Sequence, residues 1–380
     1  HAGYLPLRIE AVPEGTIVPV SNVVCQVINT DPEFYWLPSY IETALLRAIW
    51  YPSTVASVSY YCKGIIRNAL EKSADTTDSL PFRLHDFGAR GASSFESVAL
   101  GSLANLVNFS GTDSMTALVA ASRWYGMDKD MPAFSIPAAE HSTMTAWGRD
   151  GETAAFANMI EQFGGKDKAF SVVSDSYDLW NAIDNIWGDA LKEDVKNMGG
   201  TLVIRPDSGE PIKVVREALE RLAVKFGTTI NSKGYKVLPD YVRIIQGDGI
   251  SAQSLGKIIH AVMDAGFSAE NITFGMGGGL LQQVNRDTMS WAMKASAISI
   301  DGVWKDIYKD PVTSHSKRSK KGRLALIKES NGQLKTIKTD ELNTYTDASA
   351  TPKNVLRDVY VDGKLLVDDT LTMIRERTGW

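Results

Sequence analysis

The sequence predicts an α/β protein in which an irregular α/β barrel is joined to a second, β-rich domain. Three observations favour this class. Between residues 81 and 290, about seven short apolar runs are each followed by a polar turn and an amphipathic stretch, and seven or eight such units favour a barrel over an open sheet. The segments at the two ends of the chain carry alternating apolar residues, which is the pattern of strands. Apolar residues make up 44% of the chain and charged residues 22%, which is typical of a globular protein.

The first thirty residues have the pattern of strands. Leu5, Leu7 and Ile9 alternate with other residues, and apolar runs follow at 17–20 and 23–27. Residues 38–71 are rich in Ala, Leu, Ile and Tyr, which predicts a helix, and we expect Pro52 to break it.

The clearest strand–turn–helix unit covers residues 201–227. Residues 201–204 form a buried-strand run, Ser208 is placed to cap a helix, and Pro211 suits the first helical turn. Gly227 ends the apolar face of this helix. Six further segments repeat the form, at 84–91, 106–126, 134–147, 170–187, 241–266 and 271–281.

The residues beyond 290 are less regular. A basic run at 317–323 precedes strand-like segments, and the Asp362-Gly363 pair predicts a hairpin turn. We therefore expect residues 1–75 and 291–380 to form the β-rich part and residues 76–290 to form the catalytic barrel.

Composition excludes several classes of protein. There are 40 Lys and Arg against 45 Asp and Glu, a net charge of −5, which argues against a nucleic-acid binder and against a nucleic-acid role for the basic run. Cys25 and Cys62 form no metal-ligand pair or disulfide framework, so we expect a reducing, cytoplasmic compartment. No apolar run approaches the ~20 residues of a membrane span, and no signal-peptide pattern precedes the first apolar run.

Polar residues gather where the expected strands end. In a barrel these loops converge on one mouth, which is where active sites form. Any single Asp there is as well explained as a helix or turn cap, but the whole set indicates an active site. The set comprises Arg90, Asp113, His141, Asp175, Arg205, Asp207, Asp248 and Gly277–Gly279.

These residue types suit a phosphate and a ribose. The glycine run 275–279 follows a strand and opens a helix, where backbone N–H groups bind anions, although tight turns need glycine as well. Arg side chains give paired contacts to phosphate or form surface ion pairs. Asp207 and Asp248 end successive strands, where carboxylates accept ribose hydroxyls or hold Mg²⁺. Motifs of serine nucleophiles, P-loops and zinc proteases are absent from the sequence. His141 begins a helix at the mouth, which favours a functional role over a structural one.

Long blocks of the chain closely resemble the nicotinamide phosphoribosyltransferase family. The resemblance is collinear over nearly the whole chain, and it is carried by AVPEG (11–15), NTDPEFYWL (29–37), HDFGARG (85–91), NFSGTD (108–113), PAAEHSTMTAWG (137–148), VVSDSYD (172–178), VIRPDSGEP (203–211), IQGDGI (245–250), FGMGGGLLQ (274–282) and KDPVTSHSKRSKKGRL (309–324).

The resemblance implies a type II phosphoribosyltransferase fold in a homodimer. It implies that nicotinamide and phosphoribosyl pyrophosphate react to give nicotinamide mononucleotide and pyrophosphate, with Mg²⁺, and that ATP hydrolysis is coupled through a phosphohistidine. Family members also carry a preceding segment of roughly a hundred residues, the size of a small domain. This implies a separate N-terminal fragment as a further partner. The alternatives are a nicotinate phosphoribosyltransferase and an inactive fragment that acts only as a binding protein.

The same resemblance assigns roles to individual residues. His141 is similar to the phosphorylated histidine, and Phe87 to the ring that stacks on the pyridine. Asp113 is similar to the acceptor for the carboxamide. The remaining implied substrate, ribose and phosphate contacts are Arg90, Ser171, Arg205, Asp207, Asp248, Gly277, Gly278, Arg286, Lys309 and Lys317, and the implied metal ligands are Asp175 and Asp207.

Overall fold

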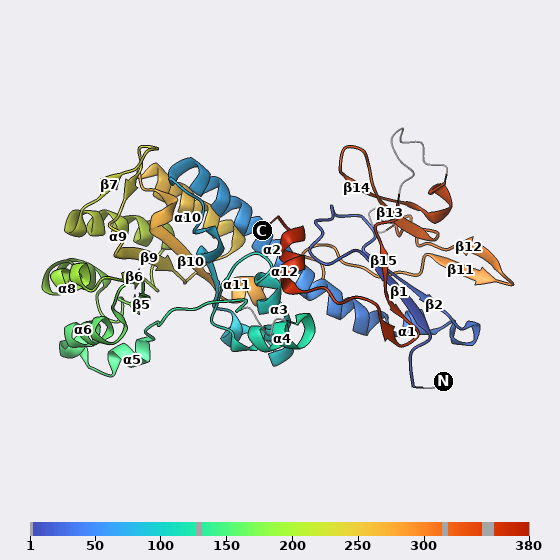
Figure 1. The fold of residues 1–380 in the computed structure, drawn as a ribbon, viewed down its shortest axis with the longest axis horizontal. Coiled ribbons are helices and arrows are strands. Elements are labelled where there is room, and N and C mark those ends of the chain that lie inside the picture. The colour runs from blue at the N-terminus through green and yellow to red at the C-terminus, as the bar shows by residue number, and fades with distance from the viewer. Residues whose placement is uncertain (1–2, 127–130, 314–317, 344–352, 380) are drawn as a thin grey trace. The chain divides into compact units, whose positions relative to one another are not determined.

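The computed structural model describes residues 3–126, 131–313, 318–343 and 353–379 (Figure 1). The chain divides into two compact units. Unit 1 consists of His1–Tyr51 and Asn285–Trp380, and unit 2 of Pro52–Val284. The domain boundaries expected at residues 75 and 290 stay a prediction.

Unit 2 is built on a six-stranded sheet whose pairings are all parallel among the described strands. The order is β4-β3-β10-β9-β6-β5, and each strand is short and apolar. The strands are β3 (Leu84–Asp86), β4 (Gly111–Thr112), β5 (Ala169–Val173), β6 (Thr201–Arg205), β9 (Val242–Gln246) and β10 (Ile272–Met276). The α/β class predicted from the alternating pattern is confirmed.

An irregular segment at 134–138 connects the two edge strands of this sheet. Phe134 forms a parallel bridge with Gly111 of β4, and Ala138 forms one with Ser171 of β5. The Phe134 N–H donates to Ser110 O at 2.7 Å, and the Ser171 N–H donates to Pro137 O at 2.8 Å. The sheet therefore curves into an irregular barrel. The 134–138 segment closes it through isolated bridges and is not a regular strand.

Helices cover the outside of this sheet, and α6, α8, α9 and α10 surround the β5–β6–β9–β10 side in Figure 1. A nine-residue π-helix, η5 (Ala182–Ala190), lies between α7 and α8. The helices are α2 (Glu42–Ser73), α3 (Phe95–Asn105), α4 (Met115–Tyr125), α5 (His141–Thr145), α6 (Glu152–Phe163), α7 (Leu179–Asn181), α8 (Lys192–Asn197), α9 (Pro211–Phe226), α10 (Ala252–Asp264) and α11 (Gly278–Leu281). A small hairpin, β7 (Thr229–Ile230) and β8 (Lys236–Val237), follows α9.

Two local expectations about helices were wrong. Helix α2 continues through Pro52, because one lost backbone hydrogen bond does not end a 32-residue helix whose later turns are buried. Helix α9 is capped by Glu210, whose carboxylate accepts from the N–H groups of Ile212 and Lys213 at 3.2 and 3.0 Å. Ser208 lies outside that cap. Pro211 in the first turn and Gly227 at the end are confirmed.

The core of unit 2 lies between the sheet and its helices. The apolar runs that predicted strands are buried, as Leu202, Ile204 and Ile244 have no exposed surface. Burying one such side chain stabilises the fold by about 1.5–3 kcal/mol. Trp187 of η5 stacks on Phe156 of α6, with ring centroids 4.4 Å apart, and both are fully buried.

Unit 1 contains antiparallel sheets formed by both ends of the chain. Its main sheet has the order β16-β15-β1-β2, so the first strand pairs with one close to the C-terminus. Asp362 and Gly363 both have positive φ, as the predicted hairpin turn between β15 and β16 requires. Residues 17–20, expected to be a strand, are irregular. The elements are β1 (Leu7–Ala11), β2 (Cys25–Asn29), α1 (Leu37–Tyr40), β11 (Ala297–Ile300), β12 (Val303–Asp306), β13 (Leu324–Lys328), β14 (Leu334–Lys338), β15 (Arg357–Val361), β16 (Lys364–Leu365) and α12 (Leu371–Arg377).

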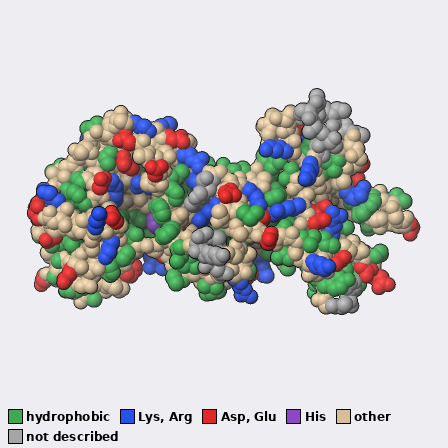
Figure 2. Space-filling view, viewed as in Figure 1, with side chains coloured by type: hydrophobic (Ala, Val, Ile, Leu, Met, Phe, Trp, Pro, Cys, Tyr) green, Lys and Arg blue, Asp and Glu red, His purple; other side chains and the backbone are tan. Residues whose placement is uncertain are grey.

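Basic and acidic side chains are mixed over the face shown in Figure 2, without a large field of one sign. This agrees with the small net charge. None of the described helices is long and apolar enough to cross a membrane.

Candidate active site

The candidate site is at the end of the barrel where the parallel strands of unit 2 finish. Phe87 follows β3, Asp113 follows β4, Asp175 follows β5, Asp207 follows β6 and Asp248 follows β9. Because parallel strands all end on the same side, residues far apart in sequence meet there. Among these residues, His141 and the acidic side chains around it are in contact.

His141 lies between two carboxylates. Its Nε2 is 2.9 Å from Asp175 Oδ1, and its Nδ1 is 3.8 Å from Asp207 Oδ2. Asp175 also accepts from the Asp207 N–H at 3.0 Å and from the Ser208 hydroxyl at 2.5 Å. When Asp175 accepts the proton of Nε2, the lone pair of the neutral imidazole is on Nδ1, on the side of Asp207.

A chain of ion pairs continues from this histidine. Arg205 Nε is 3.8 Å from Asp207 Oδ1, and Arg205 Nη2 is 3.7 Å from Glu140 Oε2. Glu140 Oε1 is 3.5 Å from Nη1 of the exposed Arg90. Arg205 Nε is buried without a hydrogen-bond partner, which is costly unless a ligand supplies an acceptor. The cluster is therefore suited to an anionic or hydroxyl-rich ligand.

The charge on Asp207 is disfavoured by its surroundings. Burial raises its pKa above the ordinary value, and the nearby carboxylates of Asp175 and Asp248 raise it further. The attraction of Arg205 and His141 opposes this. Neither Asp207 oxygen is within hydrogen-bond distance of those two partners, so both oxygens remain able to accept from a ligand.

The ring of Phe87 lies against two glycines. A Cβ added to Gly275 would be 2.1 Å from the ring, and one added to Gly247 would be 3.2 Å from it. The same Gly247 position is 3.8 Å from Asp207 Oδ1. The Phe87 ring and the Asp207 carboxylate therefore both lie close to Gly247 at the mouth.

Asp113 is exposed beside a hollow of about 450 Å³. Its Oδ1 accepts from the Ser135 hydroxyl at 2.6 Å. The hollow lies between the start of α4 and the 133–138 segment and is lined by Thr112, Asp113, Ser114, Met115, Leu118, Ala133, Phe134, Ser135, Ile136 and Ala138. A flat polar group could reach Asp113 from this side.

The chain matches the model of the nicotinate phosphoribosyltransferase (NAPRTase) family over residues 82–364. It belongs to the NAPRTase family. It is 49% identical to the nicotinamide phosphoribosyltransferase of Xanthomonas campestris pv. campestris, over 98% of this chain and 79% of the relative. It is 32% identical to the protein of that name from Acinetobacter baylyi, over 99% of this chain and 76% of the relative.

The fold has a counterpart among solved structures. Human nicotinic acid phosphoribosyltransferase superposes with a TM-score of 0.51 at 17% identity, over 99% of this chain and 76% of that one. This likeness supports a NAPRTase-type fold, which agrees with the α/β barrel and the β-rich unit.

The other predicted site residues of this NAPRTase-family chain are placed as follows. Ser171 lies buried in β5, and Asp248 is exposed after β9. Gly277 and Gly278 open α11, which is a single turn, so the glycine run forms a tight turn and not the start of a long helix. Arg286 and Lys309 belong to unit 1, where Arg286 contacts Asp287 and the carbonyl of Trp291. Lys317 lies outside the described residues.

Sequence reasoning missed two members of the cluster. Glu140 links Arg90 with Arg205, and Ser208 holds Asp175. The only sequence signal for Glu140 was its place directly before His141. The signal at Ser208 was misread as a helix cap.

The metal assignment to Asp175 and Asp207 stays a prediction. Both oxygens of Asp175 already accept hydrogen bonds from protein groups. The described residues contain no cluster of three or more His, Cys, Asp or Glu side chains suited to a metal. Asp207 and Asp248 remain able to bind an ion, which fits one held by one or two carboxylates together with substrate phosphates.

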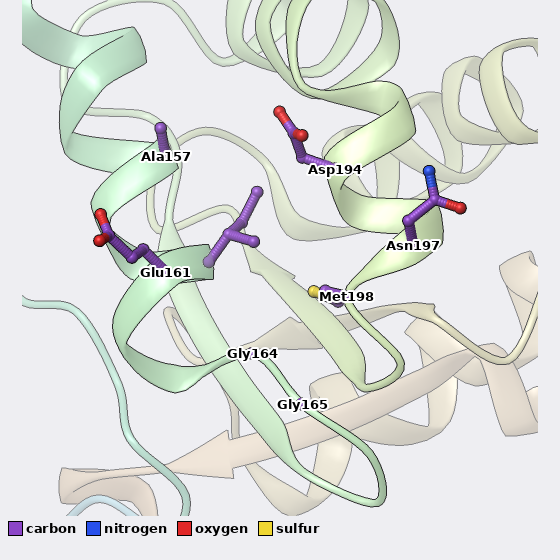
Figure 3. Close-up of a pocket in the computed structure, with 8 residues that line it drawn as sticks. Ala157, Glu161, Gly164, Gly165, Asp194, Asn197 and Met198 are labelled. Atoms are coloured by element: carbon purple, nitrogen blue, oxygen red, sulfur yellow. The ribbon is translucent and has the colours of Figure 1, made fainter.

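A second hollow of about 450 Å³ lies at the opposite end of the barrel, before β5 and β6 (Figure 3). Glu161 of α6 and Asp194 of α8 stand on its two sides, with Gly164 and Met198 between them. It contains none of the candidate site residues.

Proposed function

We propose that the protein transfers the phosphoribosyl group of 5-phosphoribosyl 1-pyrophosphate to nicotinamide in NAD salvage. The products are nicotinamide mononucleotide and pyrophosphate. The observation that carries the proposal is that the Phe87 ring and the Asp207 carboxylate both lie close to Gly247, because a base and its ribose need an aromatic ring and a carboxylate side by side. The names of the two relatives support the same reaction.

The reaction needs alignment more than proton transfer. The pyridine nitrogen attacks the anomeric carbon with its own lone pair, the bond to pyrophosphate breaks, and positive charge develops on the ribose. Phe87 orients the base. The carboxylates of Asp207 and Asp248 accept hydrogen bonds from ribose hydroxyls and stabilise the positive charge on the ribose. Arg90 and Arg205 stabilise anionic oxygens. Mg²⁺, bound through the phosphates and these carboxylates, would neutralise the departing pyrophosphate.

Asp113 determines the preference for nicotinamide over nicotinate in this proposal. Its carboxylate accepts a hydrogen bond from the amide of nicotinamide, whereas it repels the carboxylate of nicotinate. Nicotinate transfer remains the second candidate, because the family model and the human structure bear the nicotinate name.

His141 couples ATP to the transfer in this proposal. Nδ1 attacks the γ-phosphorus of ATP, ADP leaves, and a phosphohistidine forms that water later hydrolyses. Asp175 supports the step because it holds Nε2 and directs the Nδ1 lone pair outward.

The assembly that we propose is a cytoplasmic homodimer in which Lys309 and Lys317 bind phosphate of the partner's site. Two kinds of observation support it. Cys25 and Cys62 are free thiols, as in a reducing compartment. Large apolar side chains are exposed on unit 2, among them Met115, Val119 and Phe134.

An assay for nicotinamide mononucleotide tests the function. The protein is supplied with phosphoribosyl pyrophosphate, Mg²⁺ and either nicotinamide or nicotinate, with and without ATP. Intact mass spectrometry of the same sample reports whether another polypeptide accompanies the chain. Product from nicotinamide alone supports the proposal. Product from nicotinate alone favours the second candidate, and no product from either base contradicts both.

A further inference from the structure

Asp86, the last residue of β3, is a buried carboxylate outside the cluster described above. Its side chain has no exposed surface. Oδ1 accepts from the Gly88 N–H at 2.8 Å. Oδ2 accepts from the hydroxyls of Thr112 at 2.8 Å and Ser114 at 3.0 Å. A charge taken out of water is costly, and these three donors are what offset that cost.

The three donors have one feature in common, which is that each stands next to a residue that contacts the base in the proposed reaction. Phe87 lies between Asp86 and Gly88. Asp113 lies between Thr112 and Ser114, and its own N–H donates to the carbonyl of Asp86 at 3.1 Å. The backbone on both sides of Phe87 and of Asp113 is thereby tied to one residue.

We propose that Asp86 is a positioning residue that sets the distance and angle between the ring of Phe87 and the carboxylate of Asp113. It acts through these two residues and touches no substrate. The inference rests on the proposed function, since it assigns that pair to the recognition of nicotinamide. Asp86 therefore controls the affinity for the base and the preference for nicotinamide over nicotinate.

Because Asp113 is exposed, its position depends on the hydrogen bonds that Thr112 and Ser114 donate to Asp86. Asp113 is exposed, whereas Thr112 and Ser114 on either side are buried. Its loop therefore has one exposed, charged residue held between two buried hydroxyls. Thr112 also accepts from the Ser114 N–H at 3.0 Å, so the turn closes on itself around the Asp86 contact.

A carboxylate suits this position better than an amide. Both Asp86 oxygens accept hydrogen bonds, and Asn has only one accepting oxygen. In Asp86→Asn the amide nitrogen would face a donor at one of the two loops. That variant also removes a charge near Asp113, so it cannot separate position from electrostatics by itself.

The decisive variants are Thr112→Val and Ser114→Ala, which each remove one donor and leave every charge in place. For each we expect KM for nicotinamide to rise about tenfold, equivalent to about 1.4 kcal/mol. KM for phosphoribosyl pyrophosphate should stay within about twofold, because Arg205, Asp207 and Asp248, which the proposal assigns to it, lie on other loops. The ratio of nicotinate to nicotinamide kcat/KM should rise. Asp86→Asn should show a larger change of the same kind.

Ser73→Ala is the matched control. Ser73 is fully buried in unit 2, its hydroxyl donates to Ala69 O at 2.8 Å, and it accepts from the Ala269 N–H at 2.9 Å. Its loss should lower the melting temperature and leave both KM values unchanged.

The outcomes separate this inference from the proposed function. If wild type forms nicotinamide mononucleotide but Thr112→Val and Ser114→Ala change both KM values equally, or neither, Asp86 is only structural and the inference is overturned. If wild type forms no such product, the proposed function fails, and the inference fails with it. A selective rise in the KM for nicotinamide supports both.

Discussion

Asp113 presents a carboxylate to the hollow beside it and has Ser135 as a side-chain hydrogen-bond partner. A carboxylate has about four lone-pair sites, so accepting one hydroxyl leaves room for a ligand amide. We expect Asp113→Ser to loosen the preference for nicotinamide over nicotinate, because the repulsive charge is gone. Steady-state kinetics with both bases measures the ratio. Asp113→Asn keeps the size and serves as the comparison, and continued rejection of nicotinate by both variants would contradict the charge argument.

His141 gives a second prediction at this scale. Replacing it with Ala removes the nitrogen that attacks ATP and leaves Phe87, Asp113 and Asp207 in place. We expect ATP to stop stimulating product formation while a basal rate continues, measured in the same assay for nicotinamide mononucleotide. His260→Ala, at an exposed position of α10, is the control and should keep the stimulation. ATP stimulation of the His141→Ala enzyme would disprove the assigned role.

His85 makes stability depend on pH. Burial lowers the pKa of its imidazole below the usual 6.5, against the attraction of Asp113. Between the lowered pKa and 6.5 the folded state binds fewer protons than the unfolded state, so stability falls as the pH falls through that window and is fully present above it.

We expect His85→Gln, which is neutral at every pH, to make this loss shallower. Urea unfolding at several pH values from about 7.5 downward measures the slope. His260→Gln should keep the wild-type slope. An equally steep loss in His85→Gln would show that another group is responsible.

At the scale of elements, α9 shows how a cap is chosen. Glu210 accepts from two N–H groups of the first turn, while the Ser208 hydroxyl donates to Asp175 instead. Loss of an N-cap costs about 1 kcal/mol, so Glu210→Ala should lower the unfolding free energy by about that amount. Chemical denaturation provides the measurement. The exposed Lys213→Ala on the same helix should change it by less than about 0.5 kcal/mol, and equal values for the two variants would rule out the cap.

The regular elements were predictable where one pattern dominated. The apolar run at 201–204 and the amphipathic helix to Gly227 appear as β6 and α9. The expectations at Pro52 and Ser208 were wrong because the rules for proline in a helix and for a serine helix cap each describe a local preference. In α2, the burial of the turns after Pro52 outweighs one missing hydrogen bond. The Ser208 hydroxyl donates to Asp175, which is 33 positions away in the sequence.

At the scale of the whole molecule, the two ends of the chain meet in one sheet. Arg8 of β1 donates to Asp358 of β15, across 350 residues of sequence, and the two strands pair antiparallel with one register shift between Ile9 and Glu10. Tyr35, Trp36 and Tyr40 are exposed aromatic residues of this unit. Exposed apolar side chains of this kind are available to an interface such as that of the proposed homodimer.

We therefore expect light scattering to give twice the 41.5 kDa mass of the chain. Dilution to the point of dissociation should reduce activity, because each site would lose its partner's lysines. A monomer with undiminished activity would contradict the proposed assembly.

The amino-acid sequence alone predicts the α/β class, the ends of most strands and the residues that follow them. These depend on short-range physics, since apolar periodicity and turn residues act within one element. The family resemblance also rests on blocks that are continuous in sequence, and the family comparison confirms it. Asp113, Asp175 and Asp207 can therefore be named as candidate site residues from the order of residues along the chain.

Which of these residues meet depends on the tertiary structure. Asp175 is bonded to His141 across 34 residues and Asp86 holds Thr112 across 26, and no local pattern encodes either pairing. Glu140 bridges two arginines only because three loops converge. A hydrogen bond depends on distances of a few tenths of an ångström, and such distances are set by how the strands are ordered and packed in the barrel.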